Sequence, residues 1–498
     1  MDLQAFILCG QGTALSPFTQ TRGDTGLPKA LLPVANRHMI EYVLDWCEQA
    51  SFREIAVVAE PEELEQIQKA LKPYMEIRKR QHELLAKHGP TVSGVTQRQP
   101  VPLRFVEARY DTTGAILQRE LLPCIKGDFV LLPCDFVTEI PPQIFIDQFR
   151  NKDPDNLAMA VLYRNTFEII DKKPLDISYT VYSENDDSVK QPVLLDSYSK
   201  DDVDKSKYLQ IRSHLLWRYP NASVSKKLLN ASIYFCSKEL VELLAPVGPF
   251  SAISETESDN DEDTAARSQK QQAIHPIQFR AKNELIKDPI NCNKSLSKLF
   301  RDLARRSWQH STPRETVGLF ILPSLGSFIR SNILNAYMEA NRYMLRVKSL
   351  LFAAHSTPTM NNAVGADSIV GANCTILERT SVKLSVLGKN CQIGKRCRIV
   401  GSVILDNVEI EDECVLENVI VGSTSKVGKK CRLTNSYIEG SYTVNAKTVL
   451  KGETLTHIYL EESDQSSESA GSSEEEDSSD YSEADYDEEF EDDGLFER

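Results

Sequence analysis

The sequence predicts an α/β domain with a mostly parallel, doubly wound sheet, followed by a parallel β-helix and a disordered acidic tail. Over the first 165 residues, short β-rich runs alternate with helix-like stretches. From about residue 364, aliphatic residues recur mostly in steps of six, and residues 461–498 are dominated by acidic residues and serine. Because 498 residues can fold into more than one core, we place the two domains at 1–350 and 360–455.

The first domain is predicted from the order of its elements. Its β-rich runs are 5–9, 54–59, 103–106 and 128–132, and the helix-like stretches between them lie near 38–50, 61–72 and 114–122. Such an order places ligands at the carboxyl ends of parallel strands. The polar stretch 75–99 interrupts this order, and we interpret it as an insertion.

The remainder of the first domain contains a change in composition. Residues 251–272 are so rich in Ser, Asp and Glu that they cannot bury enough apolar surface to fold, so we predict a disordered acidic loop. After this loop, residues 296–308 and 333–347 are predicted to form the helices that close the domain.

The second domain is predicted from its repeat. The aliphatic residues settle into steps of six, six and five, so that Leu387, Ile404, Val421 and Ile438 recur every 17 residues. This period is typical of a parallel β-helix with three short strands per coil, whose stacked coils bury one aliphatic column. An antiparallel sandwich is the alternative, but it requires alternation with a period of two and frequent turns.

The cysteines follow the same repeat. The chain has eleven cysteines and no Cys-x-x-Cys pair, so their spacing does not indicate a zinc site. Five of them lie two residues before an aliphatic position of the repeat: Cys374, Cys391, Cys397, Cys414 and Cys431. We predict that these five side chains point inward at the corners of the β-helix and serve packing.

Charge and hydropathy exclude several classes of function. The formal charge is −15, but residues 461–498 alone carry −17, so the remaining chain is close to neutral. No broad basic surface is therefore expected, which argues against direct nucleic acid binding. The N-terminus has no basic signal region and no stretch is apolar enough to span a bilayer. We expect a protein of the cytoplasm (cytosol) that does not contact membranes.

A glycine-rich turn follows the first β-rich run. It contains Gly10, Gly12 and Thr13, and Lys29 follows within Pro28-Lys29-Ala30-Leu31-Leu32-Pro33-Val34. Glycines at such a turn let backbone N–H groups approach phosphate oxygens, and a lysine adds positive charge. A tight turn without a ligand is the alternative for the glycines taken alone.

Together, these two motifs resemble the signature of the sugar-phosphate nucleotidyltransferases. The resemblance implies a Rossmann-like nucleotidyltransferase domain followed by a left-handed parallel β-helix built from hexapeptide repeats. Further positions fit in order. Thr113 and Gly114 correspond to a turn that contacts the nucleotide, Asp135 to a magnesium ligand, and Asn230-Ala231-Ser232-Ile233-Tyr234 to a segment bordering the sugar.

Three departures from the family pattern bear on activity. Ala14 stands where active members carry an arginine, Ser232 replaces a glycine, and no second metal-binding carboxylate can be assigned. Loss of one such electrostatic donor costs roughly 3–4 kcal/mol of transition-state stabilisation. We therefore expect no catalytic residues and no cofactor, with vestigial nucleotide-binding residues (Gly10, Gly12, Thr13, Lys29, Thr113 and Gly114) and a vestigial metal ligand (Asp135). Weak residual nucleotide binding is a further hypothesis.

A degenerate nucleotidyltransferase domain joined to a β-helix is similar to certain subunits of translation initiation factor 2B. The sequence after about residue 453 leaves no room for the helical exchange domain of epsilon-type subunits, which favours the gamma type. The resemblance implies pairing with a catalytic epsilon subunit, a decamer with alpha, beta and delta subunits, and translation initiation factor 2 as the substrate. The alternatives are a working nucleotide-sugar pyrophosphorylase, such as a mannose-1-phosphate guanylyltransferase, or its regulatory subunit.

Overall fold

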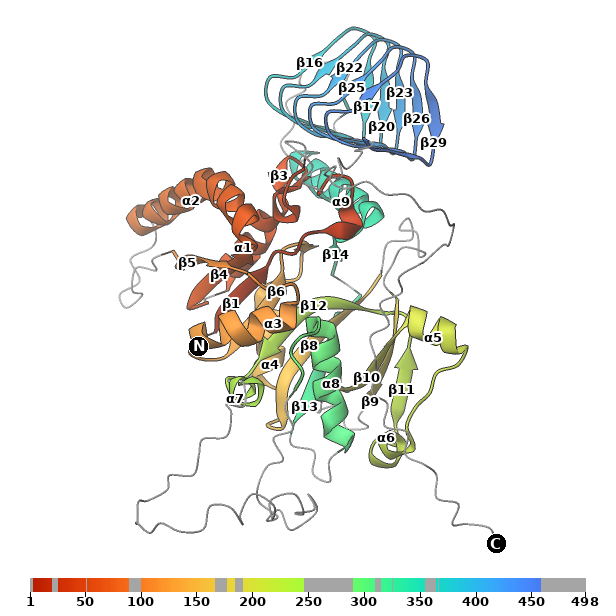
Figure 1. Ribbon diagram of the computed structural model, residues 1–498. Coiled ribbons are helices and arrows are strands. Elements are labelled where there is room, and N and C mark those ends of the chain that lie inside the picture. The colour runs from red at the N-terminus through yellow and green to blue at the C-terminus, as the bar shows by residue number, and fades with distance from the viewer. Residues whose placement is uncertain are drawn as a thin grey trace, which may run out of the picture. The chain divides into compact units, whose positions relative to one another are not determined.

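The structure is a computed structural model that describes most of the chain up to residue 457 (Figure 1). The described residues are 3–19, 26–50, 52–88, 100–165, 177–183, 191–245, 290–309, 315–324, 326–353, 364–365 and 367–457. The predicted acidic loop 251–272 and the predicted tail 461–498 lie outside these ranges. Residues 1–457 form one compact unit by their contacts.

A ten-stranded sheet forms the centre of the first domain. In spatial order its strands are β11 (Ala222–Ser225), β9 (Ser178–Ser183), β10 (Val193–Ser199), β13 (Thr316–Ile321), β8 (Asn156–Arg164), β12 (Leu228–Cys236), β6 (Phe129–Pro133), β1 (Gln4–Leu8), β4 (Glu54–Ala59) and β5 (Leu103–Glu107). The four strands predicted from the first 165 residues are all present, and β6, β1, β4 and β5 are parallel to their neighbours within this group. The rest of the sheet is mixed and not mostly parallel. β13 runs parallel to β8, but β12 runs antiparallel between β6 and β8, and β9, β10, β11 and β13 form further antiparallel pairs.

Helices cover both faces of this sheet, which explains why its strands are continuous apolar runs. Ala5 and Ile7 of β1 pack on the side of α1 (Met39–Gln49), α2 (Pro61–His88) and α4 (Pro142–Arg150). Phe6 packs on the opposite side, with α3 (Thr113–Ile116), α7 (Glu239–Leu244) and α8 (Leu296–Gln309). The alternation follows from the two-residue period of a strand.

In the stretch that we interpret as an insertion, residues 75–88 continue α2. Polar contacts hold this part of α2 to α1. Tyr74, directly before it, donates from Oη to Asp45 Oδ1 at 2.8 Å, and Arg78 forms an ion pair with Glu48. Without an apolar stripe, the sequence carries no helical periodicity there. Residues 89–99 lie outside the described part of the chain.

The remaining elements of the first domain are short except for α9. They are β2 (Pro33–Val34), β3 (Arg37–His38), β7 (Phe136–Thr138), β14 (Phe328–Arg330), α5 (Lys200–Ser206), α6 (Ser213–Arg218) and α9 (Leu334–Ala353). The predicted helix 114–122 is a series of short helical turns between Thr113 and Cys124. No helix in the described ranges combines the length and apolarity needed to cross a membrane.

The second domain has the predicted β-helical repeat. Three parallel sheets run along it, and in each the partner of a residue lies 17 positions further on, as in Leu387 with Ile404 and Ile404 with Val421. The first sheet contains β15 (Ile369–Val370), β18 (Val386–Leu387), β21 (Val403–Ile404), β24 (Ile420–Val421), β27 (Tyr437–Ile438) and β30 (Thr454–Leu455). The second contains β16 (Thr375–Ile376), β19 (Gln392–Ile393), β22 (Glu409–Ile410), β25 (Lys426–Val427) and β28 (Thr443–Val444). The third contains β17 (Ser381–Lys383), β20 (Arg398–Val400), β23 (Val415–Glu417), β26 (Arg432–Thr434) and β29 (Val449–Lys451).

The interior of the β-helix is the predicted aliphatic column. Twelve consecutive repeat positions from Val382 to Val444 are buried, whereas Val370 in the first strand is 37% exposed. The inward position of Cys391, Cys397, Cys414 and Cys431 is confirmed, while Cys374 is only partly buried. Each buried thiol also donates a hydrogen bond to the carbonyl 14 residues further on, as Cys391 Sγ does to Leu405 O at 3.2 Å. The thiols therefore satisfy corner carbonyls in addition to filling space.

Helix α9 connects the segment after Lys29 to the β-helix. Tyr337 Oη donates to Pro33 O at 2.5 Å, and Asn341 Oδ1 accepts from the N–H of Ala35 at 2.8 Å. On the other side, Arg342 donates to Asn418 Oδ1 at 2.7 Å. Apolar residues of α9 share one cluster with residues of both domains, so the helix is more than a connector.

Candidate functional site

The glycine-rich turn follows β1, as the sequence predicts. Gly12 has φ of 71°, a left-handed conformation that favours glycine, and a Cβ there would lie 3.0 Å from the Cβ of Lys29. The carbonyl of Gly12 accepts a hydrogen bond from Thr19 Oγ1 at 2.7 Å. Gly10 and Thr13 are exposed, and a Cβ at Gly10 would meet nothing within 4 Å. The turn therefore places Lys29 closely against Gly12.

Asp135 forms ion pairs with two cationic residues, Lys29 and Arg330. Lys29 Nζ lies 2.6 Å from Asp135 Oδ2, while Arg330 Nε and Nη2 donate to Oδ1 at 3.0 Å and Oδ2 at 2.9 Å. Asp135 follows β6 and is fully buried. The site thus contains one carboxylate, both of whose oxygens are bound by cations.

Two cations also control the ionisation of Asp135. Burial alone raises the pKa of a carboxyl group, but the charges of Arg330 and Lys29 outweigh burial and hold the pKa of Asp135 well below its usual value. In turn, although burial opposes it, Asp135 raises the pKa of Arg330. The carboxylate remains ionised at neutral pH and is already neutralised by its partners.

This arrangement does not fit a magnesium site. Mg²⁺ needs oxygen ligands in an octahedral arrangement. At Asp135 it would meet Lys29 and Arg330, which together bind both carboxylate oxygens. Within the described ranges, no three His, Cys, Asp or Glu side chains are grouped so that they could hold a metal ion. We therefore assign no chemistry to a metal at this position.

Arg330 is a site residue that the sequence reasoning missed. It ends β14, which pairs antiparallel with β7, so that Arg330 lies opposite Phe136 and next to Asp135. The N–H of Ser331 also donates to Asp135 O at 2.7 Å. In the sequence, Arg330 is a single arginine after two apolar residues and 195 positions from Asp135, so no local signal marks it.

Ser232 connects this ion-pair cluster to the segment expected to border a sugar. Ser232 has φ of 54°, so the backbone keeps a conformation suited to the glycine that the family pattern predicts. The Asn230 side chain stabilises it by accepting from the N–H of Ser232 at 2.8 Å. The Ser232 hydroxyl in turn accepts a hydrogen bond from Arg330 Nη1 at 2.6 Å. The serine therefore helps to fix Arg330.

Thr113 and Gly114 are placed differently from the other predicted residues. Thr113 Oγ1 accepts from the N–H of Leu296 at 2.9 Å, and the N–H of Gly114 donates to Lys294 O at 3.0 Å. A Cβ at Gly114 would lie 2.5 Å from the carbonyl oxygens of both Cys292 and Lys294. The predicted nucleotide turn is thus packed against the segment before α8, which the glycine allows to approach closely.

A cavity of about 400 Å³ opens beside the ion-pair cluster. Asn230, Ser232 and Arg330 line one part of it, and Ser295, Ser297, Lys298 and Arg301 line another. The charged side chains that line this cavity are cationic, and two of them are paired with carboxylates, Arg301 with Asp302 and Arg330 with Asp135.

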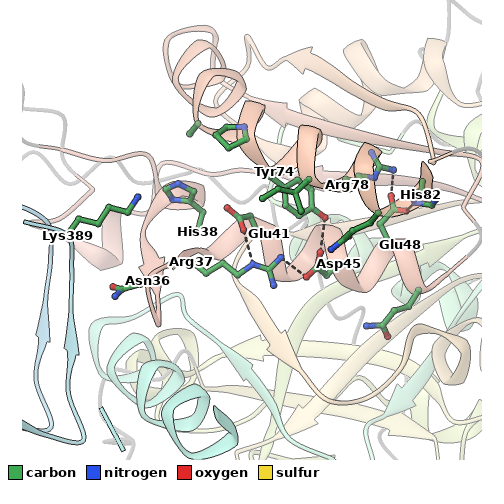
Figure 2. Close-up of a pocket in the computed structure, with 15 residues that line it drawn as sticks. Asn36, Arg37, His38, Glu41, Asp45, Glu48, Tyr74, Arg78, His82 and Lys389 are labelled. Atoms are coloured by element: carbon green, nitrogen blue, oxygen red, sulfur yellow. Dashed lines mark hydrogen bonds and ion pairs between the residues drawn. The ribbon is translucent and has the colours of Figure 1, made fainter. Parts of the chain in front are cut away.

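A larger cavity of about 690 Å³ lies elsewhere, between α1 and α2 (Figure 2). Its carboxylates are already paired, Glu41 and Asp45 with Arg37, and Glu48 with Arg78. Figure 2 shows Arg37 beside Glu41 and Asp45, and Arg78 beside Glu48. This cavity brings together no group that the nucleotide-site prediction named.

Comparison with known proteins matches this chain to two family models and to curated relatives. The model described as "Nucleotidyl transferase" matches residues 5–167, and the model described as "EIF2B subunit epsilon LbH domain" matches residues 353–455. The chain is also similar to "Translation initiation factor eIF2B subunit gamma" of Schizosaccharomyces pombe, with 26% identity over 254 residues. That alignment covers 51% of this chain and 49% of the relative, so the chain spans about half the length of the relative it matches.

Proposed function

We propose, from the premise that this chain is an eIF2B gamma-like member of the nucleotidyltransferase family, that it is a non-catalytic subunit of a guanine-nucleotide exchange factor. The observation that carries the proposal is the binding of both Asp135 oxygens by Lys29 and Arg330. A nucleotidyltransferase needs this carboxylate for a metal ion, whereas a structural subunit can use it as a fixed ion pair.

The proposed loss of catalysis rests on charge. Phosphoryl-group transfer is accelerated mainly by cations placed where negative charge develops. Here the glycine-rich turn carries Ala14 in an exposed position, and Lys29 and Arg330 are committed to Asp135. Freeing Asp135 for a metal would leave two cations in a largely buried site without their partner, which is unfavourable.

A coupled assay of pyrophosphate release from GTP and mannose 1-phosphate tests this part of the proposal. We expect no release above the background of a denatured control, both for the wild-type chain and for Ala14→Arg. Turnover by the wild-type chain would favour the alternative of a nucleotide-sugar pyrophosphorylase. Turnover gained by Ala14→Arg would mean that Asp135 is available to a metal ion after all.

The proposed partners follow from the similarity to eIF2B gamma. We place the chain with a catalytic epsilon subunit, within a decamer that also contains alpha, beta and delta subunits, in the cytosol. The substrate of this complex is translation initiation factor 2, from which it releases GDP to support translation initiation. Phosphorylation of that factor in the integrated stress response then slows the cycle in which this chain takes part.

Affinity purification of the tagged chain from native cytosol tests these partners. The expected result is stoichiometric recovery of an epsilon-type subunit with an additional helical domain, together with translation initiation factor 2. Recovery of the chain only with itself would contradict the proposal. Recovery with a catalytic pyrophosphorylase would support the alternative of a regulatory subunit.

The proposal also keeps a weak affinity of the vestigial pocket for nucleotides. Its support is that Gly12, with a left-handed backbone, lies against Lys29, although the Lys29 ammonium group is paired with Asp135. The hydrogen bonds of Thr113 with Leu296 and of Gly114 with Lys294 limit this affinity, because a nucleotide bound at that turn must displace both of them. Titration calorimetry with GTP, GDP and ATP tests this: binding at millimolar concentration supports the proposal, and its absence removes it.

A further inference from the structure

The ten-stranded sheet ends at β11, a short strand with a partner on one side. Within the described residues, β11 pairs antiparallel with β9 and with no strand beyond it. Figure 1 shows α5 and α6 close to β11 at this end of the sheet. We call residues 205–227, which include α6 and β11, the edge surface.

The edge surface exposes large apolar side chains. Trp217 is 80% exposed, Tyr208 65%, Leu216 46% and Val224 45%. The neighbouring Leu215 is fully buried in a cluster with Trp308, so α6 is anchored by one residue and presents the next two to solvent. Exposed tryptophan and tyrosine side chains of this kind are the residues that dominate the binding energy of protein interfaces.

The edge surface is basic, whereas residues 1–460 as a whole are close to neutral. Between Lys205 and Lys227 there are six Lys and Arg residues and no Asp or Glu, directly after Asp201, Asp202 and Asp204. Five of the six are exposed, namely Lys205, Lys207, Arg212, Lys226 and Lys227. Charge complementarity therefore favours an acidic partner.

We propose that the edge surface binds an extended acidic segment of a partner protein, which adds to β11 as a further strand. The outer side of an edge strand presents N–H and C=O groups that another strand can pair with. Acidic side chains of the segment then meet the flanking lysines, and an aromatic or aliphatic side chain packs against Trp217.

A polypeptide fits these observations better than a lipid surface or a nucleic acid. Only a polypeptide strand supplies alternating donors and acceptors to the edge of β11. Trp217 and Tyr208 have rings on which bases could stack, but a nucleic acid would leave the outer N–H and C=O groups of β11 without strand partners. The proposal goes beyond the exchange-factor function and does not depend on it, since it rests on exposure, charge and sheet topology.

The test is binding of a labelled 12-residue peptide to the full chain, followed by fluorescence anisotropy. The probe alternates Glu and Val and contains one Tyr; a second peptide has Lys in place of every Glu. We expect the acidic peptide to bind and the basic peptide not to bind. The dissociation constant should rise at least tenfold in Trp217→Ala and in the double variant Lys226→Glu/Lys227→Glu, and it should also rise with salt.

Matched control variants separate binding at the edge surface from the general effect of an exposed apolar side chain or a basic pair elsewhere in the chain. Val449→Ala removes an apolar side chain that is 70% exposed on the β-helix. Lys79→Glu/Arg80→Glu reverses an adjacent, exposed basic pair on α2. Both controls should bind the acidic peptide like the wild-type chain, and all variants should keep its thermal midpoint. An equal loss in the control variants would overturn the proposal.

Hydrogen exchange supplies the readout that is specific for strand addition. On addition of the acidic peptide, the amides of residues 222–225 that point away from β9 should exchange more slowly, because they acquire a strand partner. Binding without this protection contradicts strand addition. Failure of the peptide to bind at millimolar concentration, or Trp217-dependent binding of phosphatidylserine vesicles or poly(U) in its place, also overturns the proposal.

Discussion

Asp135 and Arg330, which lie 195 positions apart in the chain, form a two-point ion pair with N–O distances of 3.0 and 2.9 Å. Lys29 completes it from the segment after the glycine-rich turn. Three parts of the first domain thus meet at one buried carboxylate. Asp135 is thus a structural junction of these three segments.

Removing one partner of this junction should destabilise the protein strongly. In Arg330→Gln, the buried Asp135 keeps only Lys29, and loss of one partner of a buried pair typically costs roughly 3–5 kcal/mol. We expect a similar loss in Asp135→Asn, and a loss in the double variant smaller than the sum of the two. Urea unfolding of the four proteins measures this coupling.

The exposed pair of Arg398 and Glu417 provides the control for that experiment. Their side chains are 65% and 41% exposed, so Arg398→Gln should cost less than about 1 kcal/mol. Additive losses in the Asp135 and Arg330 variants would show that the two residues are not coupled.

The two glycines of the turn should respond differently to alanine. Gly12 has a positive φ and packs against Lys29, so Gly12→Ala should lower the free energy of unfolding by about 1–2 kcal/mol. Gly10→Ala should change it by less than about 0.5 kcal/mol, because a Cβ there meets nothing within 4 Å. Equal effects in thermal unfolding would contradict the close approach of Lys29 to Gly12.

Glu63 gives the stability a specific pH dependence. Burial, with a contribution from Glu60, raises the pKa of Glu63 from 4.5 to about 7. Between these values the folded carboxyl binds a proton that the unfolded one has released, so stability falls as pH rises from about 4.5 to 7.

Glu63→Gln should remove this component of the pH dependence. The thermal midpoint of the variant should fall less between pH 5 and 8 than that of the wild-type chain. Glu62→Gln, a neighbouring change at an exposed position, is the matched control and should keep the wild-type profile. An unchanged profile in Glu63→Gln would show that its carboxyl is ionised throughout this range.

Substitution by alanine should destabilise the β-helix at buried positions and have little effect on its stability at exposed positions. Leu416 is fully buried in the aliphatic column, so Leu416→Ala should cost roughly 2–5 kcal/mol. Val449→Ala, at a position 70% exposed, should cost less than about 0.5 kcal/mol. Urea denaturation of both variants checks the difference, and equal losses would argue against the packed column.

The β-helix could be predicted almost residue by residue, because each coil repeats information that lies within 17 positions of sequence. The 17-residue spacing of Leu387, Ile404 and Val421 predicts that they are partners in neighbouring parallel strands, as the structure shows. Cys391 could likewise be placed inward, although the hydrogen bond of its thiol to Leu405 O could not be predicted.

The candidate site was predictable only in part. Gly12, Lys29 and Asp135 lie in recognisable motifs, and the structure brings them together. Arg330 lies outside any motif, so sequence reasoning could not show that Asp135 is bound by two cations. The packing of Gly114 against Lys294 depends on segments far apart in the chain, which no local pattern reports.

The most direct test of the account is the rate of GDP release from translation initiation factor 2, measured with an epsilon-type subunit alone and with an equimolar amount of this chain. We expect faster release with the chain than without it, and no release by the chain alone. Equal rates with and without the chain, in a mixture where the two proteins form a complex, would contradict it.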